Sequence, residues 1–343
     1  MIRIGVIGCG RIAQSRHLPE YSENENVIIA AVYSPNRERA SGVGAQYGAS
    51  VYDSCEDLIA DPQIDAVSVC TPNATHFNIT VKALRAGKHV LCEKPMATTP
   101  EECELMVSTA RETGKHLMIA HNQRFAAAHV EAKKMIAQGA IGKILTFRTI
   151  FGHKGPESWT INAEDNWFFD KARAAFGVIA DLGAHKIDLL HYLTSSRIIS
   201  ATALTGTFDK KRGDGRKIDV DDNAICIFEM DNGSAGTMTV SWTRPGPEEN
   251  STVFYGTQGV LRIYDDPESS LIIERSDGSR VLAGTDKIAT NEEQTKSGVI
   301  DSWINSLVTN TPPEIPIEES HYTMNALFAA MESARTRTPV AVS

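Results

Sequence analysis

A glycine pattern near the start of the chain limits the folds that this sequence can adopt. A short apolar run, Ile2–Ile7, leads directly into Gly8-Cys9-Gly10-Arg11-Ile12-Ala13, a GxGxxA pattern. Gly8 permits a tight turn, Gly10 lets the backbone approach a pyrophosphate, and Ala13 is small enough for a helix to pack on the strand. The free N–H groups of that helix would face the phosphates. A plain strand–turn–helix corner shares the pattern, but its place ahead of further strand–helix units indicates dinucleotide binding.

The first 122 residues alternate short β-rich runs with helix-like segments. Such alternation predicts a parallel sheet wound by right-handed crossovers. We expect Pro19 to shorten or kink the first helix. The expected strands are Ile2–Ile7, Val27–Tyr33, Ala66–Cys70, His89–Cys92 and His116–Ala120, and the expected helices cover about 12–21, 37–47, 56–60, 75–86 and 100–113.

After residue 122 the pattern changes to strand after strand, separated by Gly, Asn and Asp turns. With 343 residues the chain is long enough for about two domains. We therefore expect a Rossmann domain over 1–122 and a second, α+β domain over 123–343 with a large, mostly antiparallel open sheet. The expected strands are 143–152, 200–207, 223–230, 234–242, 252–255, 259–264 and 271–274, and the expected helices are 127–138, 179–193, 295–310 and 318–335.

Charge and cysteine usage exclude several classes of partner. Lys and Arg number 34 against 43 Asp and Glu, so the formal charge of −9 makes nucleic acid and anionic membrane poor partners. The longest clean apolar run is far too short to span a bilayer, and the N-terminus does not resemble a signal peptide. Six cysteines without CxxC spacing predict free thiols in a reducing cytoplasm, with no zinc site or other metal.

The end of the second strand bears on which dinucleotide binds. An acidic residue there would bind the ribose hydroxyls of NAD, but the sequence reads Tyr33-Ser34-Pro35-Asn36-Arg37, with Arg39 nearby. Ser34 is placed to hydrogen-bond a 2′-phosphate and Arg37 to pair with it. Alternatively, Ser34 is a turn residue and Arg37 a solvated helix start. We expect NADP as the preferred cofactor and NAD as the alternative.

Two further segments follow predicted strands. Thr71-Pro72-Asn73-Ala74-Thr75-His76 comes after the third strand, and Glu93-Lys94-Pro95 comes after the fourth. Ligands of such sheets bind outside the carboxyl ends of the strands. A lone lysine is usually a surface charge, but Lys94 is placed to reach a substrate hydroxyl beside a nicotinamide. The expected cofactor contacts are Gly8, Gly10, Arg11, Ile12, Ser34, Arg37, Thr71, Pro72, Asn73, His76, Glu93 and Lys94.

A polar motif on the predicted helix 179–193 carries acid–base groups. At about 100° per residue, Asp181, His185 and Asp188 share one face. An Asp and a His one turn apart can hydrogen-bond, which orients the imidazole and supports its charged form. The alternative is a solvated polar face with a satisfied histidine. A zinc site of His185 with His191 is disfavoured, because that spacing does not bring them onto one turn.

Together, GCGRIA, TPNATH, EKP and the DLGAH…D helix resemble the glucose–fructose oxidoreductase/inositol dehydrogenase (Gfo/Idh/MocA) family, in the same order and spacing. The resemblance covers essentially the whole chain. It implies a Rossmann domain, a C-terminal domain with an open sheet, NAD(P), and oxidoreduction of sugars or cyclitols. It also implies that Lys94, Asp181 and His185 form the catalytic group. The sequence departs from the family at Ala175-Phe176-Gly177, where a glycine cluster is common, and at Lys186, where an acid is common.

Substrate contacts are expected from the start of the second domain and from the loop before the catalytic helix. Aromatic rings there can pack on the apolar face of a sugar, while polar groups bind its hydroxyls. The alternative is a loop anchored by core aromatics. Lys154, Lys171 and Arg173 leave room for an acidic or phosphorylated substrate. The expected substrate-binding residues are Asn122, Arg124, Trp159, Asn166 and Trp167, with Phe168 beside them.

The expected function is hydride transfer between a nicotinamide and a carbinol or carbonyl carbon of a sugar, cyclitol or related polyol. Two alternatives use the same fold: a glycosidase that keeps its NAD through a redox cycle, and a dinucleotide-sensing regulator that does no chemistry. We also expect a homodimer or homotetramer, because few helices are available to cover so large a second sheet and a bare apolar face is an interaction site.

Overall fold

The computed structural model of the protein describes residues 1–161, 166–284 and 296–343, and the chain divides into two compact units. The first unit contains residues 1–122 and 159–161 together with 296–321. The second contains residues 123–158, 166–284 and 322–343. The cut after residue 122 is where the sequence pattern changes. Residues 296–321 group with the first unit, although they were expected in the second domain.

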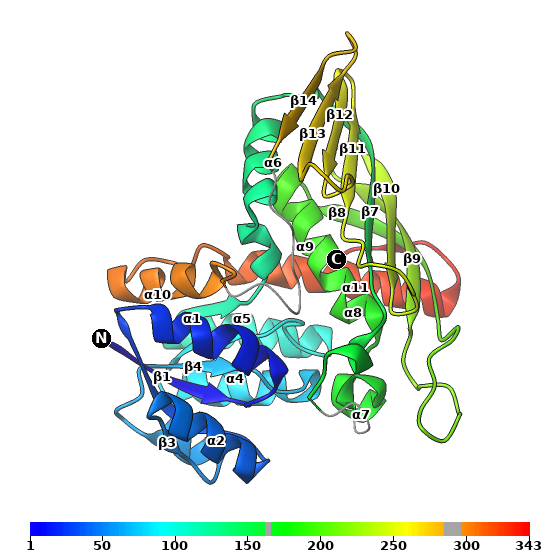
Figure 1. The fold of residues 1–343 in the computed structure, drawn as a ribbon. Coiled ribbons are helices and arrows are strands. Elements are labelled where there is room, and N and C mark those ends of the chain that lie inside the picture. The colour runs from blue at the N-terminus through cyan, green and yellow to red at the C-terminus, as the bar shows by residue number, and fades with distance from the viewer. Residues whose placement is uncertain (162–165, 285–295) are drawn as a thin grey trace. The chain divides into compact units, whose positions relative to one another are not determined.

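The first unit is built around a six-stranded parallel sheet in the order β3-β2-β1-β4-β5-β6 (Figure 1). The strand order reverses between β1 and β4, which is the crevice where doubly wound sheets bind ligands. The short β3 was not expected, since two residues carry no alternation pattern. The strands are β1 Ile2–Ile7, β2 Val27–Tyr33, β3 Ser50–Val51, β4 Ala66–Val69, β5 His89–Cys92 and β6 Leu117–Ile119.

Side-chain caps explain where several helices of the first unit begin. Asn36, Ser54 and Thr99 each accept a backbone N–H of the first turn, which satisfies a donor that the helix itself leaves open. The expected first helix is divided near Pro19, into a π-helix and a short α-helix. The helical segments are η1 Ala13–His17, α1 Leu18–Glu23, α2 Arg37–Tyr47, α3 Cys55–Ala60, η2 Asn73–Thr75, α4 His76–Arg85 and α5 Pro100–Thr113.

A helix from late in the sequence completes the first unit. Helix α10, Val299–Thr309, contacts β1 and α1 (Figure 1). Its Trp303 is fully buried, and Asn24 donates to Asp301 over 3.0 Å. The apolar stripe of α10 therefore covers the Rossmann core, which is why this segment does not belong to the second unit. The helix was expected from residue 295, which lies outside the described residues.

The second unit contains a nine-stranded sheet in the order β14-β13-β12-β11-β7-β10-β9-β8-β15. All neighbouring pairs are antiparallel except β7 with β10. This agrees with the mostly antiparallel sheet that was expected, although β14 and β15 were missed. The strands are β7 Ile144–Gly152, β8 Ile198–Gly206, β9 Asn223–Met230, β10 Ala235–Ser241, β11 Thr252–Gly256, β12 Gly259–Ile263, β13 Leu271–Arg275, β14 Arg280–Ala283 and β15 Val340–Ala341.

Helices of the second unit contact one another and the sheet. Helix α9 contacts β7 and β10, α8 contacts β9 and β10, and α6 contacts α9 and β12. No helix of the described residues is long and apolar enough to cross a membrane. The helical segments are η3 Asn122–Phe125, α6 Ala127–Ala137, η4 Pro156–Ser158, η5 Trp167–Phe169, α7 Lys171–Ala174, α8 Val178–Asp181, α9 Gly183–Thr194 and α11 Ile317–Thr336, of which η3 and α11 run from one unit into the other.

Candidate active site

Four of the predicted cofactor segments lie side by side at the carboxyl edge of the first sheet. The Gly8 amide donates to Tyr33 O over 2.8 Å, which joins the ends of β1 and β2. The Cys70 amide donates to Ile7 O over 2.8 Å, and the Glu93 amide donates to Val69 O over 3.0 Å. These bonds place the fingerprint, the end of β2, the Thr71 segment and the Glu93 segment next to one another. The edge is where a dinucleotide would bind in this fold.

The fingerprint glycines have the geometry that their predicted roles require. Gly8 has a φ of +99°, and an added Cβ would lie 2.5 Å from Cys70 O, so a side chain is excluded there. An added Cβ at Gly10 would meet no atom within 4 Å, which leaves open space beside its backbone. Arg11 is exposed and Ile12 half-buried. Cys9 between the glycines is buried, and burial raises the pKa of its thiol to about 11.

Next to the end of β2 lies a carboxylate, Asp53, that the sequence pattern did not reveal. Ser34 is buried, whereas Arg37 is exposed and forms an ion pair with Asp53. Asp53 follows β3, which pairs in parallel with β2 and thus ends at the same edge. The predicted phosphate contact of Arg37 would compete with this pair. Such exposed pairs contribute only about 0–1 kcal/mol, so the arginine is available to a stronger anion.

The Thr71 and Glu93 segments are connected through His76. Nδ1 of His76 is 2.8 Å from Pro95 O, and Nε2 is 2.8 Å from Thr71 O. Burial lowers the pKa of His76, while the two carbonyl acceptors oppose that shift. The Lys94–Pro95 bond is cis. Thr71, Pro72 and the buried Asn73 flank the same loop.

In the second unit, the polar motif does not lie on one continuous helix. Helix α8 ends at Asp181 and α9 begins at Gly183. Asp221 accepts the amides of Gly177 and Ile179 over 3.0 and 2.8 Å, and so caps α8. An added Cβ at Gly177 would lie 1.9 Å from the Asp221 carbonyl oxygen. Gly177 is the one glycine in the segment Ala175-Phe176-Gly177, where the family commonly has several, and packing requires it.

The structure shows a contact for each of the three polar residues that were expected on one face. Asp181 accepts a hydrogen bond of 3.0 Å from the indole nitrogen of Trp242, which is fully buried. Asp188 accepts two bonds from Arg124, 2.8 Å from Nε and 2.6 Å from Nη2. His185 is buried with its ring 6.0 Å from that of Phe151. These three positions thus contain a carboxylate bound by Trp242, a buried imidazole and one half of a buried ion pair.

The position of Arg124 differs from that of an open substrate contact. Its side chain is 4% exposed and that of Asp188 is 1% exposed. Two of its donors are committed to the carboxylate, which gives the guanidinium a structural contact within the second unit. Substrate binding by Arg124 stays a prediction. Asn122, in the first unit, is also buried.

The aromatic residues of the predicted substrate loop belong to both units. Trp159, half-buried, groups with the first unit. In the second, Asn166 caps the turn η5 by accepting the Phe168 amide, and Trp167 stacks on Phe168 at 3.9 Å. Phe168 in turn meets Trp242 edge-on at 6.2 Å. The loop is thus partly a core anchor, which was the alternative interpretation, and it supports the residue that binds Asp181.

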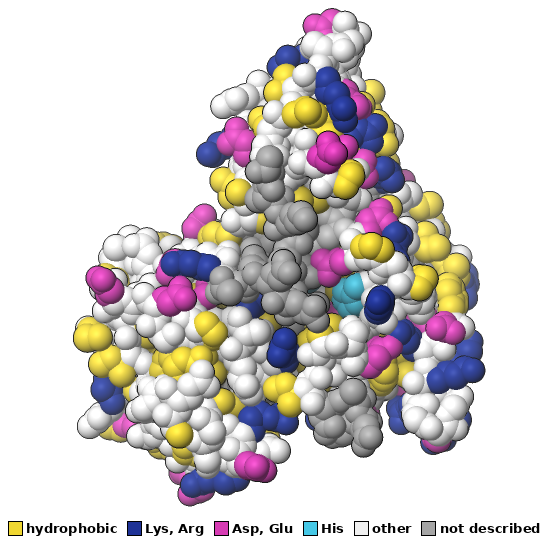
Figure 2. Space-filling model, in the orientation of Figure 1, with side chains coloured by type: hydrophobic (Ala, Val, Ile, Leu, Met, Phe, Trp, Pro, Cys, Tyr) yellow, Lys and Arg dark blue, Asp and Glu magenta, His cyan; other side chains and the backbone are white. Residues whose placement is uncertain are grey.

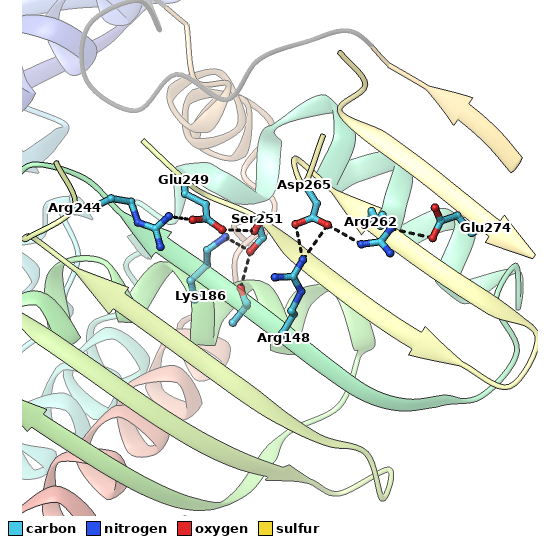
Figure 3. A network of polar contacts seen from close by, with 9 residues as sticks. Arg148, Lys186, Arg244, Glu249, Ser251, Arg262, Asp265 and Glu274 are labelled. Carbon is cyan, nitrogen blue, oxygen red and sulfur yellow. Dashed lines mark hydrogen bonds and ion pairs between the residues drawn. The ribbon is translucent and has the colours of Figure 1, made fainter. Parts of the chain in front are cut away.

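Lys186, next to His185, is fully buried. Its ammonium donates to Ser251 O over 3.3 Å and to Thr252 Oγ1 over 3.5 Å. Burial lowers the pKa of Lys186 to about 7, and the charge of Glu248 opposes that shift. Figure 3 shows Ser251 between Lys186 and Glu249, whose carboxylate pairs with Arg244. The departure from the family pattern therefore places a fully buried lysine next in sequence to the predicted base.

Sequence comparisons assign the chain to a family. The oxidoreductase family with an NAD-binding Rossmann fold matches residues 2–121, and the GFO/IDH/MocA C-terminal domain matches residues 129–262. A 1,5-anhydro-D-fructose reductase of Ensifer adhaerens is 31% identical over 262 residues, covering 76% of this chain and 75% of that protein. The chain belongs to the Gfo/Idh/MocA family of oxidoreductases.

Other members of the Gfo/Idh/MocA family match almost the full length. D-glucoside 3-dehydrogenase of Escherichia coli (strain K12) is 27% identical over 355 residues, covering 99% of this chain and 97% of that protein. The solved structure of a levoglucosan dehydrogenase in complex with NADH and L-sorbose has a TM-score of 0.87 at 25% identity, covering 100% of this chain and 99% of that one. These findings confirm the predicted fold class and the prediction of an NAD(P)-dependent oxidoreductase.

Sequence reasoning missed Trp242, Asp53 and Asp221 in this Gfo/Idh/MocA protein. Trp242 and Asp221 lie 61 and 44 residues from Asp181 and Gly177, which they contact, whereas Asp53 lies 16 residues from Arg37. None of the three belongs to a motif. A tryptophan at the end of a strand carries one weak signal, since a buried indole N–H requires an acceptor. The sequence offered nothing to say that this acceptor is Asp181.

Proposed function

We propose that this protein transfers a hydride between NAD(P) and a carbinol or carbonyl carbon of a sugar, cyclitol or related polyol. The observation that carries the proposal is the buried Asp181–His185 segment of the second unit, with Asp181 held by Trp242. Relatives named as dehydrogenases of glucosides, levoglucosan and inositol support the substrate class.

The proposed chemistry divides among three residues. A carbinol gives up hydride only if its hydroxyl proton leaves as well, and His185 is the proposed base, since an imidazole nitrogen can accept that proton. Asp181 orients the imidazole and stabilises its charged form. Lys94 of the first unit hydrogen-bonds the reacting oxygen and stabilises negative charge that develops there. The nicotinamide, when bound, supplies or accepts the hydride.

The proposed cofactor contacts are the residues at the carboxyl edge of the first sheet. Gly8 and Gly10 fit a pyrophosphate, because one permits the turn and the other leaves open space. NADP is the preferred cofactor in this proposal. Two positive charges, on Arg37 and Arg39, support this preference. The charge of Arg39 is felt at the fingerprint, because it lowers the pKa of the Cys9 thiol, although burial has the larger effect on that pKa. The other proposed contacts are Arg11, Ile12, Ser34, Thr71, Pro72, Asn73, His76, Glu93 and Lys94.

The proposed substrate contacts combine aromatic surface with polar groups. Trp159 and Trp167 are half-buried and keep ring surface for the apolar face of a sugar. Polar contacts would come from Asn122, Arg124 and Asn166. Because Nε and Nη2 of Arg124 donate to Asp188, this residue would contact substrate through its other N–H groups. Replacement of either tryptophan by leucine should raise the KM for substrate more than it lowers kcat.

We also propose that two copies associate through the sheet of the second unit. In β9 the residues alternate, so that Ala224, Cys226 and Phe228 are buried while Ile225 and Ile227 are 47% and 53% exposed. In the register of the sheet, Ile225 lies opposite Leu204 of β8, which is 40% exposed. Hydrophobic side chains gather over this part of the second unit in Figure 2. A monomer by light scattering at micromolar concentration would contradict a homodimer or homotetramer.

The cytoplasm is the location that we propose. All six cysteines are free thiols, and five are buried. Free thiols persist in reducing compartments. Recovery of the native protein from an extracellular or periplasmic fraction would contradict this assignment.

A panel of sugars, cyclitols and polyols tests the proposed reaction. Each compound is offered with NAD and with NADP, and the reduced nicotinamide is followed by its absorbance. We expect net reduction of added cofactor with at least one polyol and a lower KM for NADP. A glycosidase that recycles its NAD would cleave substrate without net reduction, and a sensing protein would bind cofactor without turnover.

A further inference from the structure

A buried chain of polar side chains runs through the first unit to the segment that carries Lys94. Its centre is His17, the last residue of η1, which is 1% exposed. Nδ1 of His17 is 3.2 Å from Ser68 Oγ, and that oxygen is 2.6 Å from the Tyr21 hydroxyl. Nε2 of His17 is 2.9 Å from Glu93 Oε1. The chain joins the fingerprint helix, strand β4 and the loop after β5.

Every member of this chain can be satisfied at once. Nε2–H donates to Glu93 whether or not Nδ1 also carries a proton, and Ser68 Oγ can donate to a bare Nδ1 or accept from Nδ1–H, while the Tyr21 hydroxyl donates to Ser68. Burial raises the pKa of Glu93, but the hydrogen bond and charge of His17, with the charges of Lys94 and Arg16, outweigh it and hold that pKa at about 2. The carboxylate is therefore ionised, and His17 is its side-chain donor.

Glu93 also contacts the backbone of Lys94. Its second oxygen, Oε2, accepts the Lys94 amide over 3.2 Å. On the far side of Lys94, the Pro95 carbonyl oxygen is 2.8 Å from Nδ1 of His76. The backbone from which Lys94 extends is thus held by one buried histidine before it and by another after it.

The helix that follows the fingerprint glycines has an irregular turn, which ends at His17. The Leu18 amide donates to Ala13 O, five residues back, so the turn that ends in His17 is a π-turn. Single π-turns are rare and occur frequently at functional sites, because the extra residue changes the direction of the side chains that follow. His17 is the residue of that turn whose ring reaches both Ser68 and Glu93.

We propose that His17 is a positioning residue of the reaction, which fixes Glu93 and, through Glu93, the backbone that carries Lys94. This rests on the proposed function, in which Lys94 hydrogen-bonds the reacting oxygen. The precision of such a contact matters, since a displacement of about 1 Å can lower a rate by about 10²-fold. His17 itself contacts neither substrate nor cofactor in this proposal.

Two substitutions separate the two contacts of the imidazole. The amide nitrogen of His17→Gln can take the place of Nε2 and still donate to Glu93. The amide of His17→Asn reaches only the place of Nδ1 and can contact Ser68 but not Glu93. We expect His17→Asn to lower kcat roughly 10–100-fold, with the dissociation constant of NAD(P)H changed by a smaller factor than kcat, and His17→Gln to restore most of kcat.

A second measurement does not depend on turnover. Hydrogen exchange of a peptide spanning residues 92–97 reports whether the Lys94 amide is held. We expect roughly tenfold faster exchange there in His17→Asn, unchanged exchange in His17→Gln, and unchanged exchange at the fingerprint loop in both. The matched control is His89→Asn at the opposite end of β5, where the new amide oxygen can still accept the His116 amide that His89 Nδ1 accepts over 3.0 Å.

Each outcome decides the proposal. Equal kcat in the Gln and Asn variants, or a loss in His17→Asn without faster exchange at residues 92–97, would overturn it. A loss of the same size in His89→Asn would do so as well. If the wild-type protein reduces no cofactor with any polyol, the proposed function fails, while the exchange data still decide whether His17 holds the Lys94 segment.

Discussion

The indole nitrogen of Trp242 donates a hydrogen bond of 3.0 Å to Oδ2 of Asp181 in the interior of the second unit. Trp242 follows β10, and Phe168 and Phe169 contact its ring at 6.2 and 6.0 Å. The carboxylate that we propose to orient His185 is therefore itself oriented by the sheet and by the aromatic loop. Its position depends on residues that no motif contains.

Replacing Trp242 by phenylalanine tests this relationship. The variant keeps much of the ring but removes the N–H donor, which leaves a buried carboxylate oxygen without that bond. We expect unfolding free energy to fall by about 1–3 kcal/mol and kcat to fall about tenfold. Urea unfolding and steady-state kinetics measure the two effects. Phe168→Leu removes one ring contact of Trp242 but keeps the N–H donor, so it should lower kcat less than Trp242→Phe does.

Removal of the proposed base should affect chemistry and not cofactor binding. His185→Ala is expected to lower kcat by roughly 10²–10⁴-fold, which is about 3–5 kcal/mol of barrier. Lys94→Met should act similarly, with some loss of substrate binding. The dissociation constant of NAD(P)H, measured by fluorescence, should barely change in His185→Ala. Near-full activity of that variant would show that the base is another residue.

The buried ion pair of Arg124 and Asp188 should contribute more to the free energy of unfolding than an exposed ion pair does. Arg124→Met removes two hydrogen bonds and a positive charge from a buried carboxylate, so we expect unfolding free energy to fall by about 3–5 kcal/mol. The double variant with Asp188→Leu should regain most of this loss. Arg111→Ala breaks the exposed pair with Glu318 and should cost less than about 1 kcal/mol. A double variant that is stable but has a high KM would show that Arg124 also binds substrate.

Lys186 should make stability depend on pH. Its pKa in the folded protein is lowered from 10.5 to about 7, so between these values the unfolded chain binds the additional proton. The unfolding free energy contributed by this group therefore rises with pH above 7, by about 1.4 kcal/mol per unit. Lys186→Met removes the effect, and its stability advantage over the wild type should shrink from pH 7 to pH 9. Lys82→Met, at an exposed lysine, should differ from wild type by a constant amount, and equal pH slopes in Lys186→Met and wild type would contradict the burial argument.

Arg37 should distinguish the two cofactors. Arg37→Ala is expected to weaken NADP by about 1.5–3 kcal/mol, the value of a charge-assisted contact, and to leave NAD nearly unchanged. Asp53→Asn releases Arg37 from its ion pair and should not weaken NADP. Equal losses for both cofactors in Arg37→Ala, or a wild-type preference for NAD, would show that the 2′-phosphate is not bound here.

Local patterns were sufficient for most elements of the fold. The strand Ile2–Ile7 and the helices Arg37–Tyr47 and Pro100–Thr113 have the bounds that were expected, because apolar periodicity and caps such as Thr99 act over a few residues. The two-residue strands β3 and β15 were missed, since they are defined only by the neighbour that they pair with.

In the candidate site, too, local sequence indicated some features and tertiary contacts decided the others. Gly8, Gly10, Lys94, Asp181 and His185 were named from local motifs, because turns and strand ends are local properties of the chain, and the family resemblance implied the catalytic role of the last three. Tertiary structure alone decided that Asp181 meets Trp242 and that Asp188 meets Arg124, over separations of 61 and 64 residues. It also decided that Lys186 is buried and that α10 covers the Rossmann core. The physical reason is that burial and pairing depend on which surfaces the folded chain brings together, whereas spacing along the sequence determines only which side chains share a face.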